Sequence, residues 1–112
     1  MPDEPTSHQR FGTPQVINDV IQYQEDAVVS RELIHQPTGT ITLFAFDTQQ
    51  GLSEHAAPFD ALVLVTDGRA EIRVAAVTHE LKAGEMLLLP AKTPHALLAL
   101  EPFKMILIMI KS

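Results

Sequence analysis

Residues 84–100 read GEMLLLPAKTPHALLAL, and they carry the clearest signal in the sequence of how the chain folds. Gly84 completes a turn, and Glu85–Leu89, which is apolar after its first residue, has the length of a buried strand. A loop bounded by two prolines follows, and His95–Leu100 is a second short apolar segment. Two runs of this length, separated by turn residues and without a helical period, indicate a β protein.

The same alternation of short apolar runs and turns extends from residue 28 to the C-terminus. Thr40–Asp47 and Ala70–Val74 alternate in polarity as half-buried strands do. Turn residues recur at intervals close to the roughly 8–12 residues typical of sandwiches and barrels. We therefore predict an all-β sandwich or barrel over residues 28–112. Residues 1–27 are predicted to form an N-terminal arm that contains a short helix or an edge strand. The other expected strands are Val28–His35, Leu52–Ala57, Ala61–Val65, Val77–Leu81 and Phe103–Ile110.

The composition argues against several functions. The chain has 112 residues, which suits one domain, and its formal net charge is −6. It has no basic cluster of the kind that binds phosphates, so we expect no nucleic-acid partner. The longest apolar run, Met105–Ile110, is far shorter than the roughly 18 residues of a membrane-spanning helix. Because signal-peptide features and cysteine are both absent, we expect a cytoplasmic protein without disulfides.

Two sets of spacings resemble the motifs of the cupin superfamily. The second cupin motif is G(X)5PXG(X)2H(X)3N. Gly84, Pro90 and His95 match it, whereas Lys92 and Ala99 stand where glycine and asparagine are usual.

The first cupin motif, G(X)5HXH(X)3–4E(X)6G, is matched by His55 and Gly68. Gln49 stands at its opening glycine, and Ala57 and Ala61 stand at its second histidine and its glutamate. The resemblance covers about residues 40–110. It implies a small single-domain bacterial cupin, whose fold is a double-stranded β-helix or jelly-roll barrel.

The resemblance also implies a metal site of three histidines and one glutamate, of which this sequence has His55 and His95. Ala57 and Ala61 cannot bind a metal. Asp60 lies one residue before the glutamate position, so a regular strand directs it outward, whereas a bulge would turn it inward. We therefore expect no resident cofactor, with a divalent transition metal held weakly by His55 and His95 as the alternative.

The two histidines also suggest a small-molecule site in the barrel, because such sites combine apolar walls with a few converging polar groups. The predicted ligand-binding residues are His55, His95, Phe59, Met86 and Leu97, with Leu62, Leu64 and Leu88 as further walls. Two alternatives stay open. One is a metal-dependent enzyme, dioxygenase-like or isomerase-like, that uses the two histidines. The other is a structural or interaction protein whose barrel is a filled core.

Met105–Ile110 reads MILIMI and is therefore apolar on both faces of the expected strand. A strand buried on both sides needs a cover besides the interior of its own barrel. In so small a domain, a second copy of the chain can provide that cover. The sequence therefore predicts a homodimer.

Overall fold

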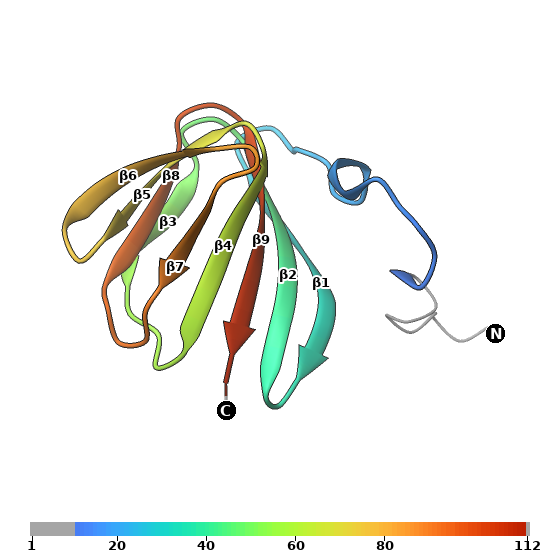
Figure 1. Cartoon of the computed structure of the whole chain (residues 1–112). Coiled ribbons are helices and arrows are strands. Elements are labelled where there is room, and N and C mark those ends of the chain that lie inside the picture. Colours follow the sequence, from blue (N-terminus) through green and yellow to red (C-terminus); the bar gives the residue numbers. More distant parts are fainter. Residues whose placement is uncertain (1–10, 112) are drawn as a thin grey trace.

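Residues 11–111, which the computed structural model describes, form nine β-strands and one turn of 3-10 helix (Figure 1). The predicted bounds of the strands differ from the observed ones by no more than two residues, and the all-β prediction is confirmed. The strands are β1 (Val28–Gln36), β2 (Gly39–Phe46), β3 (Gly51–His55), β4 (Asp60–Asp67), β5 (Arg69–Val74), β6 (Val77–Lys82), β7 (Met86–Leu89), β8 (His95–Ala99) and β9 (Phe103–Ile110).

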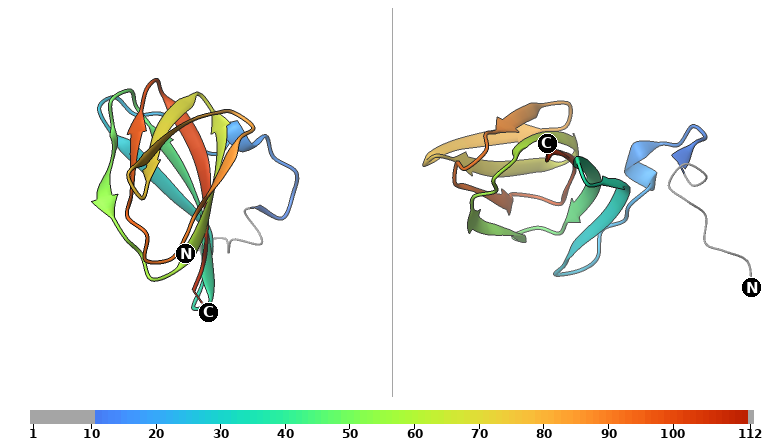
Figure 2. Two further views of the ribbon diagram at one scale, coloured as in Figure 1. Left: turned by 60° about the vertical axis from the view of Figure 1, so that its left-hand side comes forward. Right: turned by 90° about the horizontal axis from the view of Figure 1, so that it is seen from below.

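The strands form two antiparallel sheets that face each other as a jelly-roll barrel (Figure 2). One sheet has the order β1-β2-β9-β4-β7, and the other has the order β3-β8-β5-β6. The core lies between them, where Val63 and Ile72 are fully buried. The rings of Phe46 and Phe103 stack there with centroids 4.4 Å apart. This crossed strand order places residues 55 and 95, far apart in the sequence, on neighbouring strands β3 and β8.

The segment before β1 covers part of the outer face of the five-stranded sheet. It contains the helical turn η1 (Ile17–Asp19), so the helical alternative for the N-terminal segment is the one that forms. Ile21 is buried against Leu43 and Ala45 of β2. The part of the predicted arm that spans residues 1–10 lies outside the described residues. Within residues 11–111, no helix is long and apolar enough to cross a membrane.

Polar contacts hold this segment on the sheet. The hydroxyl of Tyr23 donates to Asp67 Oδ2 at 2.5 Å, and Asn18 Nδ2 donates to the carbonyl of Thr66 at 2.8 Å. The buried ammonium of Lys104 donates to the carbonyl of Asn18 at 2.5 Å and lies 4.8 Å from the centre of the Tyr23 ring. These partners offset the cost of burying a charge.

Several turns use left-handed backbone conformations. Gly68, which ends the first motif, has φ +71°, and a Cβ there would lie 1.9 Å from the carbonyl oxygen of Pro102. The same region of φ is occupied by Gln49 and Lys92, both at +64°. These are the two glycine positions of the motifs at which this sequence has another residue, and the backbone there keeps a conformation that glycine adopts most easily.

Candidate functional site

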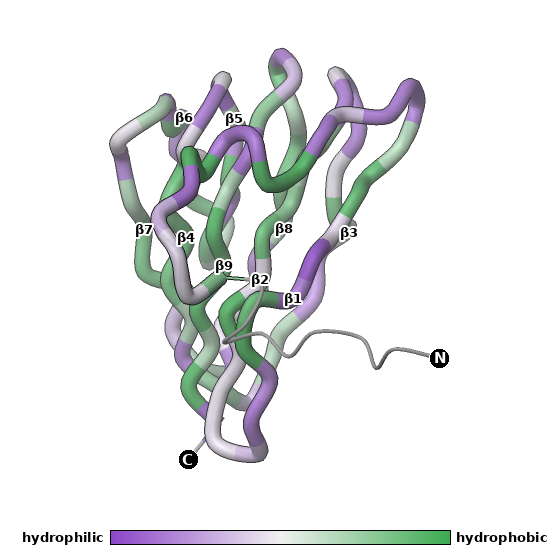
Figure 3. Tube along the Cα trace, turned by 90° about the vertical axis from the view of Figure 1, so that its right-hand side faces the viewer, coloured by the Kyte–Doolittle hydropathy of each residue, from purple (hydrophilic) through white to green (hydrophobic). Residues whose placement is uncertain are grey.

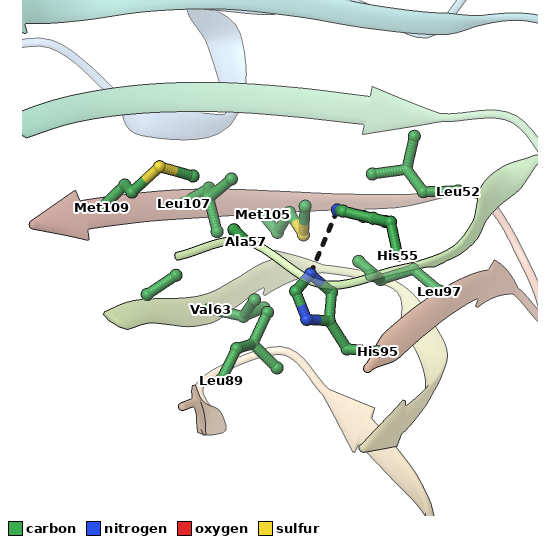
Figure 4. A pocket seen from close by; sticks show the side chains of 11 residues that line it. Leu52, His55, Ala57, Val63, Leu89, His95, Leu97, Met105, Leu107 and Met109 are labelled. Atoms are coloured by element: carbon green, nitrogen blue, oxygen red, sulfur yellow. Dashed lines mark hydrogen bonds between the residues drawn. The ribbon is translucent and has the colours of Figure 1, made fainter. Parts of the chain in front are cut away.

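A cavity opens inside the barrel, between the two sheets (Figure 4). Its free space is about 380 Å³, including the open mouth. Strands β4, β7 and β9 supply one wall, and β3 and β8 supply the other. Apart from two histidines, every side chain on the wall is apolar. The lining residues are Leu52, His55, Ala57, Ala61, Val63, Leu89, His95, Leu97, Met105, Leu107 and Met109.

His55 and His95 face each other in this cavity. His55 ends β3, His95 begins β8, and the two residues are directly paired across the strands. Their Nε2 atoms are 3.2 Å apart, and the rings meet edge to face with centroids at 4.3 Å. His95 is buried, whereas His55 is exposed at the mouth. The pair therefore forms the polar end of an apolar cavity.

Backbone carbonyls determine which nitrogens of the pair carry protons. The Nδ1 of His55 lies 2.9 Å from the carbonyl oxygen of Ser53, and the Nδ1 of His95 lies 3.2 Å from that of Thr93. A carbonyl oxygen only accepts, so each Nδ1 must donate and carry a hydrogen. Both Nε2 atoms of the neutral pair are then acceptors. A hydrogen bond between them requires one additional proton on one of the two rings.

Burial controls the charge of His95. Removal from water lowers the pKa of His95, and the neighbouring His55 lowers it further, while the hydrogen bond to the Thr93 carbonyl acts in the opposite direction. His95 is therefore the neutral, accepting member of the pair near neutral pH. The neutral pair can accept a hydrogen bond from a bound molecule, and with one additional proton the pair can donate one.

The structure brings together three of the five predicted ligand-binding residues. His55, His95 and Leu97 line the cavity. Phe59 is half-buried and is not among the lining residues; the ammonium of Lys111 lies 6.0 Å from the centre of its ring. The predicted position of Met86 is wrong, because β7 turns its side chain to the outer surface, where it is 67% exposed.

The further predicted walls on β4 and β7 are also wrong. Ala61, Val63 and Leu89 line the cavity, so the alternating residues Leu62, Leu64 and Leu88 face outward. Sequence reasoning also missed Leu52, Leu107 and the two β9 methionines Met105 and Met109 as wall residues. The sequence did contain a signal for the inward residues of β4. The motif places Ala61 at a ligand position that faces the barrel interior, so the residues at alternate positions from Ala61 face inward as well.

The side chains in the cavity do not fit the metal site that the resemblance implies. Among residues 11–111, no group of three or more histidines, cysteines, aspartates or glutamates is arranged to hold a metal ion. Ala57 and Ala61 present methyl groups to the cavity at two of the ligand positions. Asp60 is exposed, and its Oδ1 accepts from the backbone N–H of Ala91 at 2.8 Å. Because transition-metal sites usually have three or four protein ligands, two imidazoles fall short.

The barrel and its cavity define a cupin-type β-barrel with a reduced set of polar residues. The chain belongs to the cupin family, since the model of the cupin domain matches residues 42–110. A conserved protein of unknown function from Streptococcus pyogenes is 32% identical with a TM-score of 0.86, and the match covers 89% of this chain and 88% of that one. A cupin superfamily protein from Desulfitobacterium hafniense is 28% identical with a TM-score of 0.86, covering 89% and 92%.

A third structure, a cupin 2 conserved barrel domain protein from Leptotrichia buccalis, is 40% identical with a TM-score of 0.81. That match covers 84% of this chain and 46% of the other. No match was found among curated proteins. The comparisons therefore identify the family and the fold, while the chemistry of the site has to be argued from its own residues.

Proposed function

We propose that this cupin binds a small, mostly apolar molecule with one polar end inside its barrel. The observation that carries the proposal is the convergence of His55 and His95 in a cavity whose other walls are apolar. Apolar walls supply affinity by removing ligand surface from water. The two imidazoles supply orientation, because a buried nitrogen without a partner costs free energy that a ligand's polar group can recover.

The hydrogen-bonding state of the pair limits the polar end of the ligand. With both Nδ1 atoms donating to the carbonyls of Ser53 and Thr93, the neutral pair offers two acceptors. A hydroxyl or a protonated acid can donate to them. With one additional proton the pair becomes cationic and suits a carboxylate. The free space of about 380 Å³ includes the open mouth, so the enclosed part of the cavity is smaller and the ligand is small.

The methionines provide a direct test by NMR of protein labelled with ¹³C at the methionine methyl groups. Met105 and Met109 line the cavity, whereas Met86 lies on the outer surface and acts as an internal control. Isobutyrate and isobutanol serve as probes, because each combines an apolar branch with one polar end. We expect both probes to shift the methyl resonances of Met105 and Met109 and to leave Met86 unchanged.

A matched pair of variants tests the part played by the two histidines. In His55→Leu/His95→Leu we expect the probes to bind roughly 5- to 30-fold more weakly, which corresponds to about 1–2 kcal/mol for the lost hydrogen bonds. His35→Leu, a change of the same kind at an exposed residue of β1, should bind as the wild type does. Unchanged binding in the double variant would show that the two histidines take no part in binding. The absence of any shift at Met105 and Met109 in the wild type would show the barrel to be a filled core.

Elemental analysis of untagged protein separates this proposal from a metal-dependent enzyme. We expect far less than one equivalent of iron, manganese, nickel, zinc or copper per chain, since His55 and His95 are the only imidazoles among the described residues that line the cavity and no carboxylate joins them there. One equivalent of metal that disappears in His55→Ala/His95→Ala would contradict the proposal and favour the enzyme.

A further inference from the structure

The described side chains that line the cavity offer a ligand hydrogen-bond acceptors and no free donor. Only those of His55 and His95 carry nitrogen or oxygen atoms. Each Nδ1 already donates to a backbone carbonyl, that of Ser53 or that of Thr93, so each neutral ring presents a lone pair at Nε2. A ligand that meets this pair therefore has to bring the hydrogens.

The two acceptors are close enough for one ligand atom to reach both. The Nε2 atoms of His55 and His95 are 3.2 Å apart (Figure 4). A ligand nitrogen about 3 Å from each can direct one hydrogen at each imidazole, with N–H···N angles of about 140°, well above the roughly 120° below which hydrogen bonds weaken steeply. A hydroxyl has one hydrogen and so satisfies only one of the two acceptors.

The imidazole pair lies at the open end of the cavity, with apolar walls behind it. The next pair of β3 and β8 that faces the cavity, Leu52 and Leu97, lies deeper in the barrel. On the opposite wall, Val63 and Leu107 pair across β4 and β9 at the corresponding depth. Figure 3 shows β4, β8 and β9 carrying hydrophobic stretches. A ligand therefore lies with its apolar part inward and its polar group beside the imidazoles, close to water.

The surroundings of the pair favour a polar group without charge. The described side chains on the wall include no carboxylate and no lysine or arginine, so neither a cation nor an anion meets a countercharge there. Burial lowers the pKa of His95, which shows that this environment disfavours positive charge. Charged groups nearby are engaged elsewhere. Glu54 pairs with Arg73 at 3.5 Å, and the ammonium of Lys111 lies 6.0 Å from the centre of the Phe59 ring.

We propose that the barrel selects a small aliphatic primary amide, bound with its –NH₂ group between the two Nε2 atoms. The nitrogen of a primary amide is neutral and carries two hydrogens, one for each acceptor. Its carbonyl oxygen is left to the water at the mouth, and its alkyl part fills the apolar space behind the imidazoles. This proposal rests on the proposed binding of a small molecule in the barrel, and it adds the polar group that the site selects.

Four probes that share one branched alkyl group test the proposal, with binding followed through the ¹³C methyl resonances of Met105 and Met109. Isobutyramide brings two hydrogens on one nitrogen, N-methylisobutyramide brings one, isobutyrate has the shape of isobutyramide and brings none, and isobutylamine is a cation. At about pH 7.5, where the imidazoles are neutral, we expect isobutyramide to bind most tightly. Its advantage over N-methylisobutyramide should be roughly 2- to 12-fold, the equivalent of one additional net hydrogen bond.

The variant His55→Leu separates hydrogen bonding from the size of the added methyl group. It leaves one acceptor in the cavity, so the preference for isobutyramide over N-methylisobutyramide should disappear. If the preference came from a steric clash of the methyl group, it would persist in this variant. His35→Leu, at an exposed residue of β1, is the matched control and should keep the preference of the wild type. Because the two affinities are compared within one protein, a change in stability does not affect their ratio.

The outcomes separate this proposal from the proposed function. Equal binding of isobutyramide and N-methylisobutyramide to the wild type would overturn the selection of an amide, as would tighter binding of isobutyrate or isobutylamine. A preference that persists in His55→Leu would overturn it as well. In each of these cases the barrel still binds a small molecule, so the proposed function stands. The absence of a shift at Met105 and Met109 with every probe would overturn both.

Discussion

The hairpin between β5 and β6 contains backbone strain that a substitution can relieve. Its two turn residues, Ala75 and Ala76, have φ angles of +49° and +68°. Two consecutive left-handed residues are the requirement of a type I′ turn, in which glycine and asparagine are favoured. A residue with a Cβ in this left-handed region raises the free energy of the folded state by about 1–2 kcal/mol. Glycine avoids that strain but lowers stability by about 0.4–1 kcal/mol, because the unfolded chain that contains it has greater conformational entropy. The net gain from glycine is therefore about 0.5–1 kcal/mol at each position.

We expect Ala75→Gly/Ala76→Gly to raise the free energy of unfolding by about 1–2 kcal/mol and the melting temperature by roughly 4–8 °C per kcal/mol. Urea denaturation followed by circular dichroism measures the first quantity, and a thermal scan measures the second. The control is Ala83→Gly in the turn after β6, where φ is not positive, and it should destabilise by about 0.4–1 kcal/mol. Equal or lower stability of the double variant would refute the assignment of strain to this turn.

Three further expectations concern the site and its surroundings. Burial lowers the pKa of His95 in the folded state, so as the pH falls this imidazole is protonated first in the unfolded chain. The free energy of unfolding should therefore decline below about pH 6.5 and level off below the pKa of His95 in the folded state. Urea denaturation across this range should show a shallower decline for His95→Gln, and an unchanged slope would contradict the assignment. Tyr23→Phe removes the hydrogen bond to Asp67 and should lower the free energy of unfolding by about 1 kcal/mol in the same assay. An unchanged free energy of unfolding would show that this contact does not stabilise the fold. Lys92→Gly should add about 0.5–1 kcal/mol, because Lys92 has φ +64°, and a loss of stability would show that its side chain makes a larger contribution.

The strands could be predicted from the sequence because turn residues bound them at both ends. Gly68 and Gly84 adopt φ angles of +71° and +91°, so the turns that contain them follow from local backbone chemistry. Turn residues do not indicate which side chains form the walls of the cavity. β4 and β7 are apolar on both faces, so no alternation indicates which residues face the cavity. In the structure, the register with β9 turns Val63 inward and Leu64 outward, and in the sequence only the motif position of Ala61 indicates that parity.

The positions that depart from the cupin motifs show that the path of the backbone and the chemistry of the side chains are specified separately. Gln49 and Lys92 lack the usual glycine, yet both have φ +64°, so the spacing of the motif still specifies the path of the backbone. Ala57 and Ala61 lack the usual ligands and still line the cavity, so the same spacing still specifies which way each Cβ points. The chemistry of the site depends on the atoms beyond Cβ, which spacing does not determine. The fold was therefore predictable from matched intervals, while the function has to be argued from the two imidazoles that remain.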